Sequence, residues 1–598
     1  MSDYIAPLQD IRFALNELAG LARIAELPGC EEATPEMVDA ILDEAAKISA
    51  GVLAPINKSG DAEGCKLEPG FHVRTPAGCK EAYRQFIEGG WNGLNFPQEF
   101  GGQGLPKLVA TPVMEMAMAA NLGLSLCSLL TGGAIEALLR YGTDAQKQTY
   151  LPNMIAGTWS GTMNLTEPQA GSDLSLIRSR AQPEGEHHRI YGQKIFITHG
   201  EHDMVDNIIH LVLARTPDAP EGVKGISLFV VPKFLVNADG SLGRRNDVRC
   251  VSLEHKLGIH TSPTAVLAYG DEEGAIGYLV GAENRGLEYM FVMMNEARFA
   301  VGLQGVAIAD RAYQHAVAYA KERIQGKDLA NPAGKSVSII HHPDIRRMLM
   351  SMRALTESTR AVAYVTGAAI DRAHGEPDPA AREAARAFAD FMIPIHKGWA
   401  TEAGVEVANL GIQVHGGMGF VEETGAAQYL RDARITTIYE GTTGIQANDL
   451  IGRKTAREGG KTAKAIIAQM QGLLEQLAAA PGGDMQAIRS ALAEAVAAFE
   501  SCVDWIVANF RSDTLAVHAG AVPFLKLAGI VCGGWQMARA ALIAQQQLAA
   551  GGADAAFCSA KIATTRFYAD TFLAQAAGLR HTVMCTGAGA MALTEQQF

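Results

Sequence analysis

A single carboxylate, Glu440, lies between β-branched residues and a glycine in TTIYEGTTGIQ, residues 436–446. Gly441 allows the backbone to pass close to a ligand, and Thr443 with Gln446 has the spacing of a capping box at the start of a helix. We expect Glu440 at the mouth of an apolar site, where its pKa can rise as a general base requires. The simpler interpretation is a glutamate that merely begins a helix.

A glycine-rich turn could hold an anion or a polar ring edge. In MNLTEPQAGSDLS, residues 163–175, Gly171 and Ser172 offer backbone N–H groups and one hydroxyl. An ordinary surface loop has the same composition, so this stretch is informative only together with others. A second glycine-rich break, GIQVHGGMGF at 411–420, follows a helical pattern, and its simplest interpretation is a C-terminal helix cap.

The strand YGQKIFITHG, residues 191–200, brings an aromatic ring beside a hydroxyl. The two-residue period of a strand puts Phe196 and Thr198 on one face, together with Lys194. A ring and a hydroxyl in this position could flank a flat heteroaromatic group. Strand aromatics are also common in ordinary cores, and that alternative stays open.

Four regions must position these stretches, and their patterns predict an α+β protein that is mostly α. Apolar residues three and four apart indicate helices at both ends, short β-rich runs indicate an antiparallel β domain, and Thr143 with Gln146 predicts a capping box. Gly302 and Gly305 lie inside one long predicted helix, where close helix packing must favour small residues. The predicted regions are a helical domain at 1–158, a β domain at 159–284, a helical bundle at 285–453 and a helical extension at 460–598.

Composition limits the class of protein. The 598 residues carry a formal net charge of −13, which opposes binding to nucleic acid or to an anionic membrane. The nine cysteines form no CxxC pair, so we expect reduced thiols and no metal site. The amino terminus, with Asp3, lacks the order of a secretory signal, and no segment is expected to span a bilayer; the nearest candidate is 527–538. These features favour a cytoplasmic location.

Together the motifs TEPQAGSD, GQKIFITHG, YAKERI, QVHGGMGF and RDARITTIYEGTTGIQ resemble the acyl-CoA dehydrogenase family, in order and spacing, over residues 37–453. The resemblance implies an α-helical domain, a β-sheet domain and a helical bundle that enclose FAD, with acyl-CoA against the flavin. It also implies a homodimer or a higher assembly, and electron-transfer flavoprotein as the electron acceptor.

The resemblance assigns roles residue by residue. It implies that Glu440 removes the pro-R α-proton of the acyl thioester while hydride leaves the β-carbon, and that the Glu440 N–H donates to the thioester oxygen. Some members place the base on the long bundle helix, where this chain has Ala297, which cannot take a proton. The implied FAD contacts are Met163, Leu165, Thr166, Gly171, Ser172, Phe196, Thr198, Arg323, Gln413, Gly416, Gly417 and Thr442, and the implied substrate contacts are Asn295, Arg298 and Gly441.

Two features depart from the commonest family pattern. The turn after Arg323 reads RIQGKD where the family usually has Phe-Gly, and an insertion follows at 326–344, so the contact made by Arg323 is open. Asn295 stands where the family commonly has Asp. The carboxy-terminal extension resembles that of large members, including very-long-chain enzymes and the bacterial group of 3-methylmercaptopropionyl-CoA dehydrogenases.

These features predict an FAD-dependent dehydrogenase that converts a saturated acyl-CoA to the trans-2-enoyl-CoA. The substrate is either a fatty acyl-CoA or 3-(methylthio)propanoyl-CoA, and the residues do not separate the two. The alternatives are an acyl-CoA oxidase, a DNA-associated alkylation-response protein of the same fold, or a scaffold flavoprotein. From Lys454 onward there are 11 Lys and Arg against 10 Asp and Glu, a balance that disfavours the DNA-associated alternative.

Overall fold

A computed structural model describes residues 4–551 and 554–598. The chain divides into two compact units, the first mainly residues 44–105 and 116–300, and the second 7–43, 106–115 and 301–598. Each unit is described by itself. Asp3 lies outside the described residues, as does part of LAAGGAD at 548–554, whose glycines predict a hinge.

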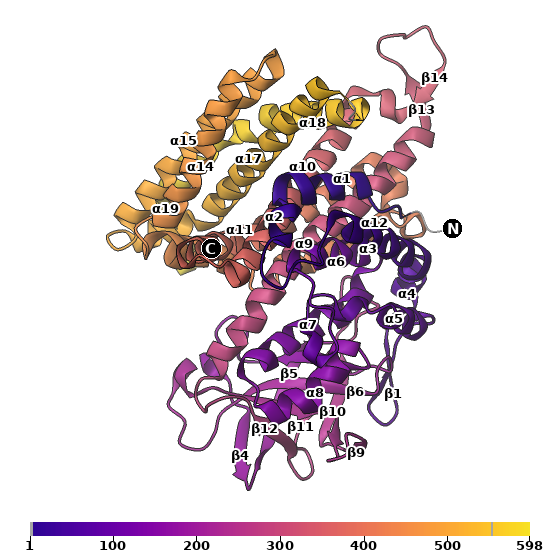
Figure 1. The fold of residues 1–598 in the computed structure, drawn as a ribbon, viewed down its shortest axis with the longest axis vertical. Helices are drawn as coiled ribbons and strands as arrows, with labels where there is room; N and C mark the ends of the chain where they lie inside the picture. The colour runs from indigo at the N-terminus through magenta and orange to yellow at the C-terminus, as the bar shows by residue number, and fades with distance from the viewer. Residues whose placement is uncertain (1–3, 552–553) are drawn as a thin grey trace. The chain divides into compact units, whose positions relative to one another are not determined.

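The first unit is built on a β-sheet (Figure 1). Its strand order is β10-β11-β5-β12-β7-β6-β3, with β4 beside β5. All of its pairs are antiparallel except β3 and β6, which run parallel, so the prediction of an antiparallel domain is wrong at that pair. A two-stranded hairpin, β1 and β2, was not predicted because three-residue strands leave no clear pattern. The strands are β1 Lys66–Glu68, β2 His72–Arg74, β3 Trp159–Asn164, β4 Arg180–Glu184, β5 His187–Thr198, β6 Asn207–Ala214, β7 Ser227–Pro232, β8 Phe234–Val236, β9 Leu242–Arg245, β10 Val248–Leu253, β11 Thr264–Tyr269 and β12 Ala275–Leu279.

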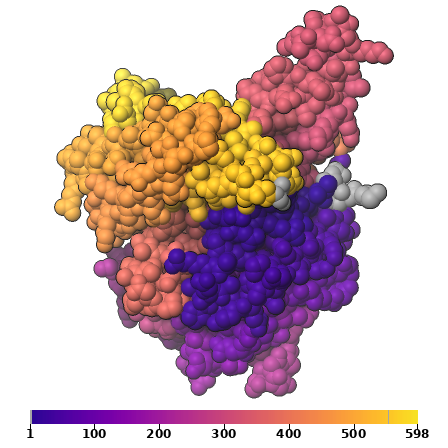
Figure 2. Space-filling view, turned by 45° about the horizontal axis from the view of Figure 1, so that its top comes forward, coloured from indigo at the N-terminus to yellow at the C-terminus, as the bar shows by residue number. Residues whose placement is uncertain are grey.

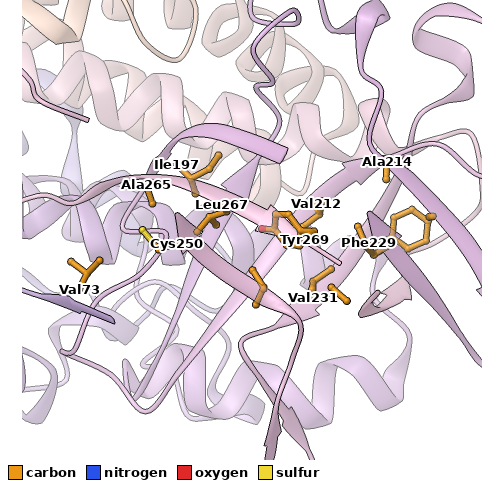
Figure 3. Packing of buried hydrophobic residues seen from close by; sticks show 14 residues of the cluster. Val73, Ile197, Val212, Ala214, Phe229, Val231, Cys250, Ala265, Leu267 and Tyr269 are labelled. Carbon is orange, nitrogen blue, oxygen red and sulfur yellow. The ribbon is translucent and has the colours of Figure 1, made fainter. Parts of the chain in front are cut away.

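Apolar side chains from several strands meet in one core cluster (Figure 3). Phe229, Val231, Leu267 and Tyr269 are almost wholly buried within it. Strands β6 and β7 are buried at every position, the pattern of strands covered on both faces. The long strand β5 runs through this sheet and ends at Thr198, so the core fixes the strand that carries Phe196.

Helices form most of the rest of the described chain (Figure 1). The predicted capping box at Thr143 is confirmed at the start of α8. The insertion after Arg323, expected as a loop, contains a small hairpin of β13 Ile324–Lys327 and β14 Ser336–Ser338. The helices are α1 Leu8–Phe13, α2 Leu21–Ala25, α3 Pro35–Ile48, α4 Asn57–Glu63, α5 Cys79–Glu88, α6 Lys107–Ala120, α7 Leu122–Tyr141, α8 Asp144–Ala156, α9 Gly286–Glu322, α10 Pro343–Gly375, α11 Pro379–His415, α12 Ala426–Arg434, α13 Thr443–Ile451, α14 Lys461–Ala479, α15 Gly483–Asn509, α16 Thr514–Ala519, α17 Ala521–Ala550, α18 Ala555–Thr571 and α19 Ala576–Ala590.

The second unit joins the amino-terminal segment to the carboxy-terminal extension. Helix α17 packs against α13 and α11 and also against α15, α18 and α19. The indigo amino-terminal segment lies against the yellow carboxy-terminal helices in Figure 2, and the rings of Phe13 and Phe557 meet edge to face with centroids 5.6 Å apart. The extension is therefore part of the same packed unit as the bundle helices that carry Glu440.

Close packing at Gly302 and Gly305 is confirmed. A Cβ built on Gly305 would lie 2.2 Å from the carbonyl oxygen of Ala400 in α11, and one on Gly302 would lie 2.4 Å from the His396 ring. Backbone cannot yield as a flexible side chain can, so the two helices would have to separate. The small residues therefore set the distance between α9 and α11.

We expect Gly305→Ala to destabilise the protein by about 2 kcal/mol, because overpacking outweighs the gain in helix propensity. Gly472→Ala in α14 is the matched control: a Cβ there meets nothing within 4 Å, so the same substitution should stabilise by up to about 1 kcal/mol. Thermal melting of both variants measures the difference. Equal melting temperatures would contradict the packing argument.

A buried cluster of charges ties together distant segments of the second unit. The Arg360 guanidinium, 2% exposed, pairs with Asp10, with Glu115 at 2.7 Å and with Asp310 at 3.1 Å. Lys561 of α18 pairs with the same Asp10. These ion pairs join the amino-terminal segment, α6, α9, α10 and the extension. Removing one partner would leave a buried charge uncompensated, so the segments stabilise one another.

The pH dependence of stability should report on this cluster. Burial raises the pKa of Asp310 from 3.8 to about 6, and Arg360 opposes the shift. Between about pH 4 and 6 the folded chain therefore keeps a proton on Asp310 that the unfolded chain has already released. This proton contributes roughly 3 kcal/mol to the free energy of unfolding at low pH, and the contribution is lost as pH rises through 6. We expect Asp310→Asn to flatten the dependence of melting temperature on pH in that window. An unchanged slope would contradict the assignment.

Two helices are long and apolar enough to cross a membrane, by length and composition: α7 and α17. The expectation that no segment meets this test is therefore corrected. In the structure 72% of the apolar window of α7 and 89% of that of α17 is buried, as in core helices.

Candidate active site

The backbone at Glu440 has an unusual conformation that neighbouring side chains maintain. Glu440 has φ +54° and Gly441 φ +90°, in the left-handed region that residues with a Cβ rarely adopt. The ammonium group of Lys397, on α11 and fully buried, donates to the carbonyl oxygens of Gly441 at 2.6 Å and Thr436 at 2.8 Å. Lys397 thus binds the chain on both sides of Glu440 and leaves the carboxylate half-buried.

Two further side chains hold the same loop. Tyr439 donates from its hydroxyl to Oε1 of Gln304 on α9 at 2.5 Å, and Gln446 donates from Nε2 to the Glu440 carbonyl at 3.2 Å. Gly441 needs glycine for its φ, and a Cβ there would lie 2.5 Å from that Gln446 nitrogen and displace the side chain that binds the Glu440 carbonyl. Burial, with the charge of Glu440, raises the pKa of Tyr439, which therefore stays a neutral donor.

The helix after Glu440 begins one residue earlier than the predicted capping box. Thr442 is the N-cap of α13, and its hydroxyl accepts from the Ile445 N–H at 3.2 Å. Thr443 donates instead to the Glu402 carboxylate at 2.5 Å. The predicted Thr443–Gln446 box is wrong because both threonines can cap, and the tertiary partner Glu402 decides between them.

The predicted face of β5 is corrected by a bulge. Leu267 of β11 pairs with Lys194 and Ala265 pairs with Ile197, so β5 has one extra residue between them. Phe196 has φ +60° there, and its ring is 58% exposed, whereas Lys194 is fully buried. Lys194 therefore does not share the outer face with Phe196 and Thr198; its side chain enters the core.

Buried Lys194 forms an ion pair with Glu167 that the two-residue alternation of the strand does not indicate. Its ammonium group lies 2.8 Å from Oε1 of Glu167 and donates to the Leu165 carbonyl at 3.1 Å. Glu167, in the TEPQAGSD motif, also accepts from the backbone N–H groups of Arg178 and Ser179. Although burial opposes ionisation, Lys194 and these donors lower the pKa of Glu167 to about 2, and burial lowers that of Lys194 to about 8.

The structure places the other expected flavin contacts on the two units. In the first unit Met163 is buried, Leu165, Thr166 and Thr198 are half-buried, and Gly171 and Ser172 are exposed. In the second unit Arg323, Gln413, Gly416 and Gly417 are exposed and Thr442 is half-buried. Of the expected substrate contacts, Asn295 is exposed, Arg298 is 4% exposed and Gly441 is half-buried.

Each unit, taken by itself, carries residues whose chemistry suits part of a flavin nucleotide. Phe196 is exposed and offers an aromatic face. The bulge in β5 holds its backbone at a positive φ that is unfavourable for a bulky residue. A Cβ at Gly171, Gly416 or Gly417 would meet nothing within 4 Å, so the backbone N–H groups there can be approached closely. In the first unit an aromatic face and the backbone donors near Gly171 suit a ring system carrying phosphates, and in the second unit Gly416 and Gly417 offer further backbone donors.

Sequence reasoning missed four residues that position this machinery: Lys397, Gln304, Glu167 and Lys194. The pairs that they form span 27 to 135 residues along the chain. The two motifs themselves carried a signal for the Glu167–Lys194 pair, since one contains a glutamate and the other a single lysine within a predicted strand. Nothing local points to Lys397.

Three side chains of the first unit that could ligate a metal lie close together: Cys127, His199 and His202. His202 accepts the Met204 N–H on Nδ1, so its proton is on Nε2, which faces Ser160 at 3.1 Å. A metal bound to Nε2 would require the imidazole proton to sit on Nδ1, but Nδ1 already accepts the Met204 N–H. Burial also raises the pKa of the Cys127 thiol to about 12, so the group suits hydrogen bonding better than ligation.

All nine cysteines are free, as predicted. Six are buried, and Cys585 is exposed.

Family models match almost the whole chain. They are the acyl-CoA dehydrogenase N-terminal domain over residues 36–158, the middle domain over 162–271, the C-terminal domain over 284–454, and an acetyl-CoA dehydrogenase C-terminal-like model over 464–594. The chain belongs to the acyl-CoA dehydrogenase family. It is therefore an oxidoreductase.

Relatives within the family match over their full lengths. A 3-methylmercaptopropionyl-CoA dehydrogenase of Ruegeria pomeroyi is 51% identical, with 98% of each chain covered. A butyryl-CoA dehydrogenase of Syntrophomonas wolfei subsp. wolfei is 34% identical, with 100% of this chain and 99% of the relative covered.

Solved structures share the acyl-CoA dehydrogenase fold. One from a study of the electron transferring flavoprotein of Acidaminococcus fermentans is 28% identical, with a TM-score of 0.58 and coverage of 70% of this chain and 97% of that one. An acyl-CoA dehydrogenase of Bacillus anthracis complexed with FAD is 20% identical, with a TM-score of 0.74 and coverage of 96% and 92%. The second likeness extends through the carboxy-terminal extension.

Proposed function

We propose that the protein is an FAD-dependent acyl-CoA dehydrogenase whose substrate is 3-(methylthio)propanoyl-CoA. Family membership supports the reaction class, and 51% identity over 98% of both chains to a 3-methylmercaptopropionyl-CoA dehydrogenase supports the substrate. A straight-chain acyl-CoA such as butyryl-CoA is the second candidate, because a butyryl-CoA dehydrogenase is 34% identical over its full length.

The observation that carries the proposal is the loop at Glu440. Lys397 and Gln446 fix the backbone on which the half-buried Glu440 carboxylate stands. The base is therefore positioned before the substrate binds, and the loop need not rearrange during the reaction. In the proposed mechanism Glu440 removes the α-proton of the thioester as general base. Its own N–H donates to the thioester oxygen, where negative charge develops as the proton leaves.

FAD, when bound, supplies the acceptor for the hydride from the β-carbon, so the substrate loses one proton and one hydride and becomes the trans-2-enoyl thioester. The proposed FAD contacts of the first unit are Met163, Leu165, Thr166, Gly171, Ser172, Phe196 and Thr198. Those of the second unit are Arg323, Gln413, Gly416, Gly417 and Thr442. Asn295, Arg298 and Gly441 are proposed to contact the substrate.

Assembly and location belong to the same proposal. We infer a cytoplasmic homodimer or higher assembly that passes electrons to electron-transfer flavoprotein. The similarity to a chain from the Acidaminococcus fermentans study, 28% identical, supports this acceptor. The proposed four-region domain arrangement keeps the boundaries 1–158, 159–284, 285–453 and 460–598.

Anaerobic mixing with a panel of thioesters tests the function. We expect 3-(methylthio)propanoyl-CoA to bleach the flavin absorbance of the purified protein faster than butyryl-, octanoyl- or palmitoyl-CoA at equal concentration. Faster bleaching by butyryl-CoA would favour the second candidate. Absence of bleaching by all four, in a protein that contains FAD, would overturn the dehydrogenase proposal.

A further inference from the structure

A cavity of about 700 Å³ opens in the second unit among the amino-terminal segment, α10, α11, α14 and α17. Its volume is within the range of cavities that hold small organic ligands. All of its lining residues belong to the second unit, and none is among the expected flavin, substrate or catalytic residues. We call it the arginine cavity, after Arg23, Arg372 and Arg539, which line it.

Arg539, on the wall of this cavity, forms no ion pair with an acidic residue in the described part of the chain. Both of its hydrogen bonds to described residues go to neutral oxygens, Gln536 Oε1 at 2.6 Å and the Leu18 carbonyl at 3.0 Å. Burial lowers the pKa of Arg539, and no nearby carboxylate opposes that shift. A partly buried guanidinium in this setting is stabilised when an anion enters the cavity.

The other two arginines share a single carboxylate. Arg23 lies 3.7 Å and Arg372 3.5 Å from the same oxygen of Glu376. Glu17 is the one acidic residue among the cavity-lining residues, and it accepts from Gln547. Three arginines against these two carboxylates leave the cavity positively charged, and planar guanidinium groups suit phosphate oxygens.

Besides aliphatic residues such as Leu473 and Leu542, the remaining wall carries aromatic and amide groups that suit a planar, polar ring. Trp535 of α17 and Phe388 of α11 line the cavity and meet edge to face, with centroids 6.5 Å apart. Amide side chains, which can both donate and accept, stand on α14 and α17 at Gln469, Gln476 and Gln546. Aromatic rings with amides are the groups that contact a purine base, whereas a fatty acyl chain would need an apolar wall throughout.

We propose that the arginine cavity binds a phosphoadenosine group, with the phosphate on Arg539 and the adenine beside Trp535. Free adenine nucleotides and CoA share this chemistry. The arginine cavity contains no residue of the loop at Glu440. It is therefore a second nucleotide site, in addition to the proposed flavin site.

Calorimetric titration of the FAD-loaded enzyme with AMP tests the proposal. We expect saturable binding of one AMP per chain, quenching of Trp535 fluorescence that Trp535→Phe removes, and at least tenfold weaker binding in Arg539→Met. Gln476→Leu, an exposed change at the rim, should weaken binding about threefold without affecting folding. Arg566→Met is the control, because Arg566 is exposed and pairs with Asp570 on α18.

Two arms separate the possible sources of the group. Displacement of AMP by CoA would show that the cavity accepts CoA, and no displacement would assign it to free nucleotides. Binding of inorganic phosphate as tightly as AMP would overturn the adenosine part of the proposal. Unchanged AMP binding in Arg539→Met, or no binding of AMP and CoA outside the catalytic site, would overturn it entirely.

Discussion

Glu440→Gln is expected to abolish bleaching of the flavin by acyl-CoA while FAD remains bound. Glutamine keeps the size of the side chain but cannot accept the α-proton, and loss of a general base typically lowers a rate by 10² to 10⁴-fold. Lys397 and Gln446 hold the loop through its carbonyl oxygens, so the substitution should leave the backbone in place. Stopped-flow absorbance under anaerobic conditions measures the rate.

Glu402→Gln is the matched control for that experiment. Glu402 is an exposed carboxylate that accepts a hydrogen bond from Thr443, which glutamine can also accept. We expect bleaching within about twofold of the unmodified enzyme, well inside the effect of losing a base. A Glu440→Gln enzyme that bleaches at the original rate would refute the assignment of the base.

Lys194→Met is expected to cost the protein its FAD as well as stability. The substitution leaves the Glu167 carboxylate, 3% exposed, without its cation, and breaking a buried ion pair on one side costs about 3 to 5 kcal/mol. Glu167 also holds the Arg178 and Ser179 N–H groups, so the segment with Gly171 and Ser172 should loosen. Thermal melting and the ratio of flavin to protein absorbance measure the two losses.

A double variant separates charge from packing at this pair. Glu167→Gln with Lys194→Met removes both charges, so no carboxylate is left buried alone, and we expect most of the lost stability to return. Arg189→Met controls for loss of an ordinary ion pair, since Arg189 pairs with the exposed Glu184. Full flavin content and an unchanged melting temperature in Lys194→Met would contradict the role of the pair.

Most of the element order was predictable from the chain itself. Helical periodicity, β-rich runs and the capping box at Thr143 depend on residues three or four apart, so local chemistry decides them. The glycines at 302 and 305 were also readable, because glycine inside a long helix implies a close neighbour. The segment around Glu440 was found the same way, from residues within one turn of each other.

The tertiary structure decided what depends on partners distant along the chain. The bulge at Phe196 arises from pairing with β11, which turns Lys194 inward and corrects the simple alternation. The helix cap moves to Thr442 because Glu402 binds Thr443. Strand β6 pairs in parallel with β3, a direction that the composition of neither strand indicates.

The chain by itself therefore determined which residues could do chemistry, and the fold determined how they are held. Lys397 lies over 40 residues before the carbonyl of Gly441 that it binds, and no spacing rule connects them. The arginine cavity likewise draws its wall from residues 17 to 546. Periodicity and capping arise from short-range backbone geometry, whereas a buried charge takes whichever partner the packed helices bring within reach.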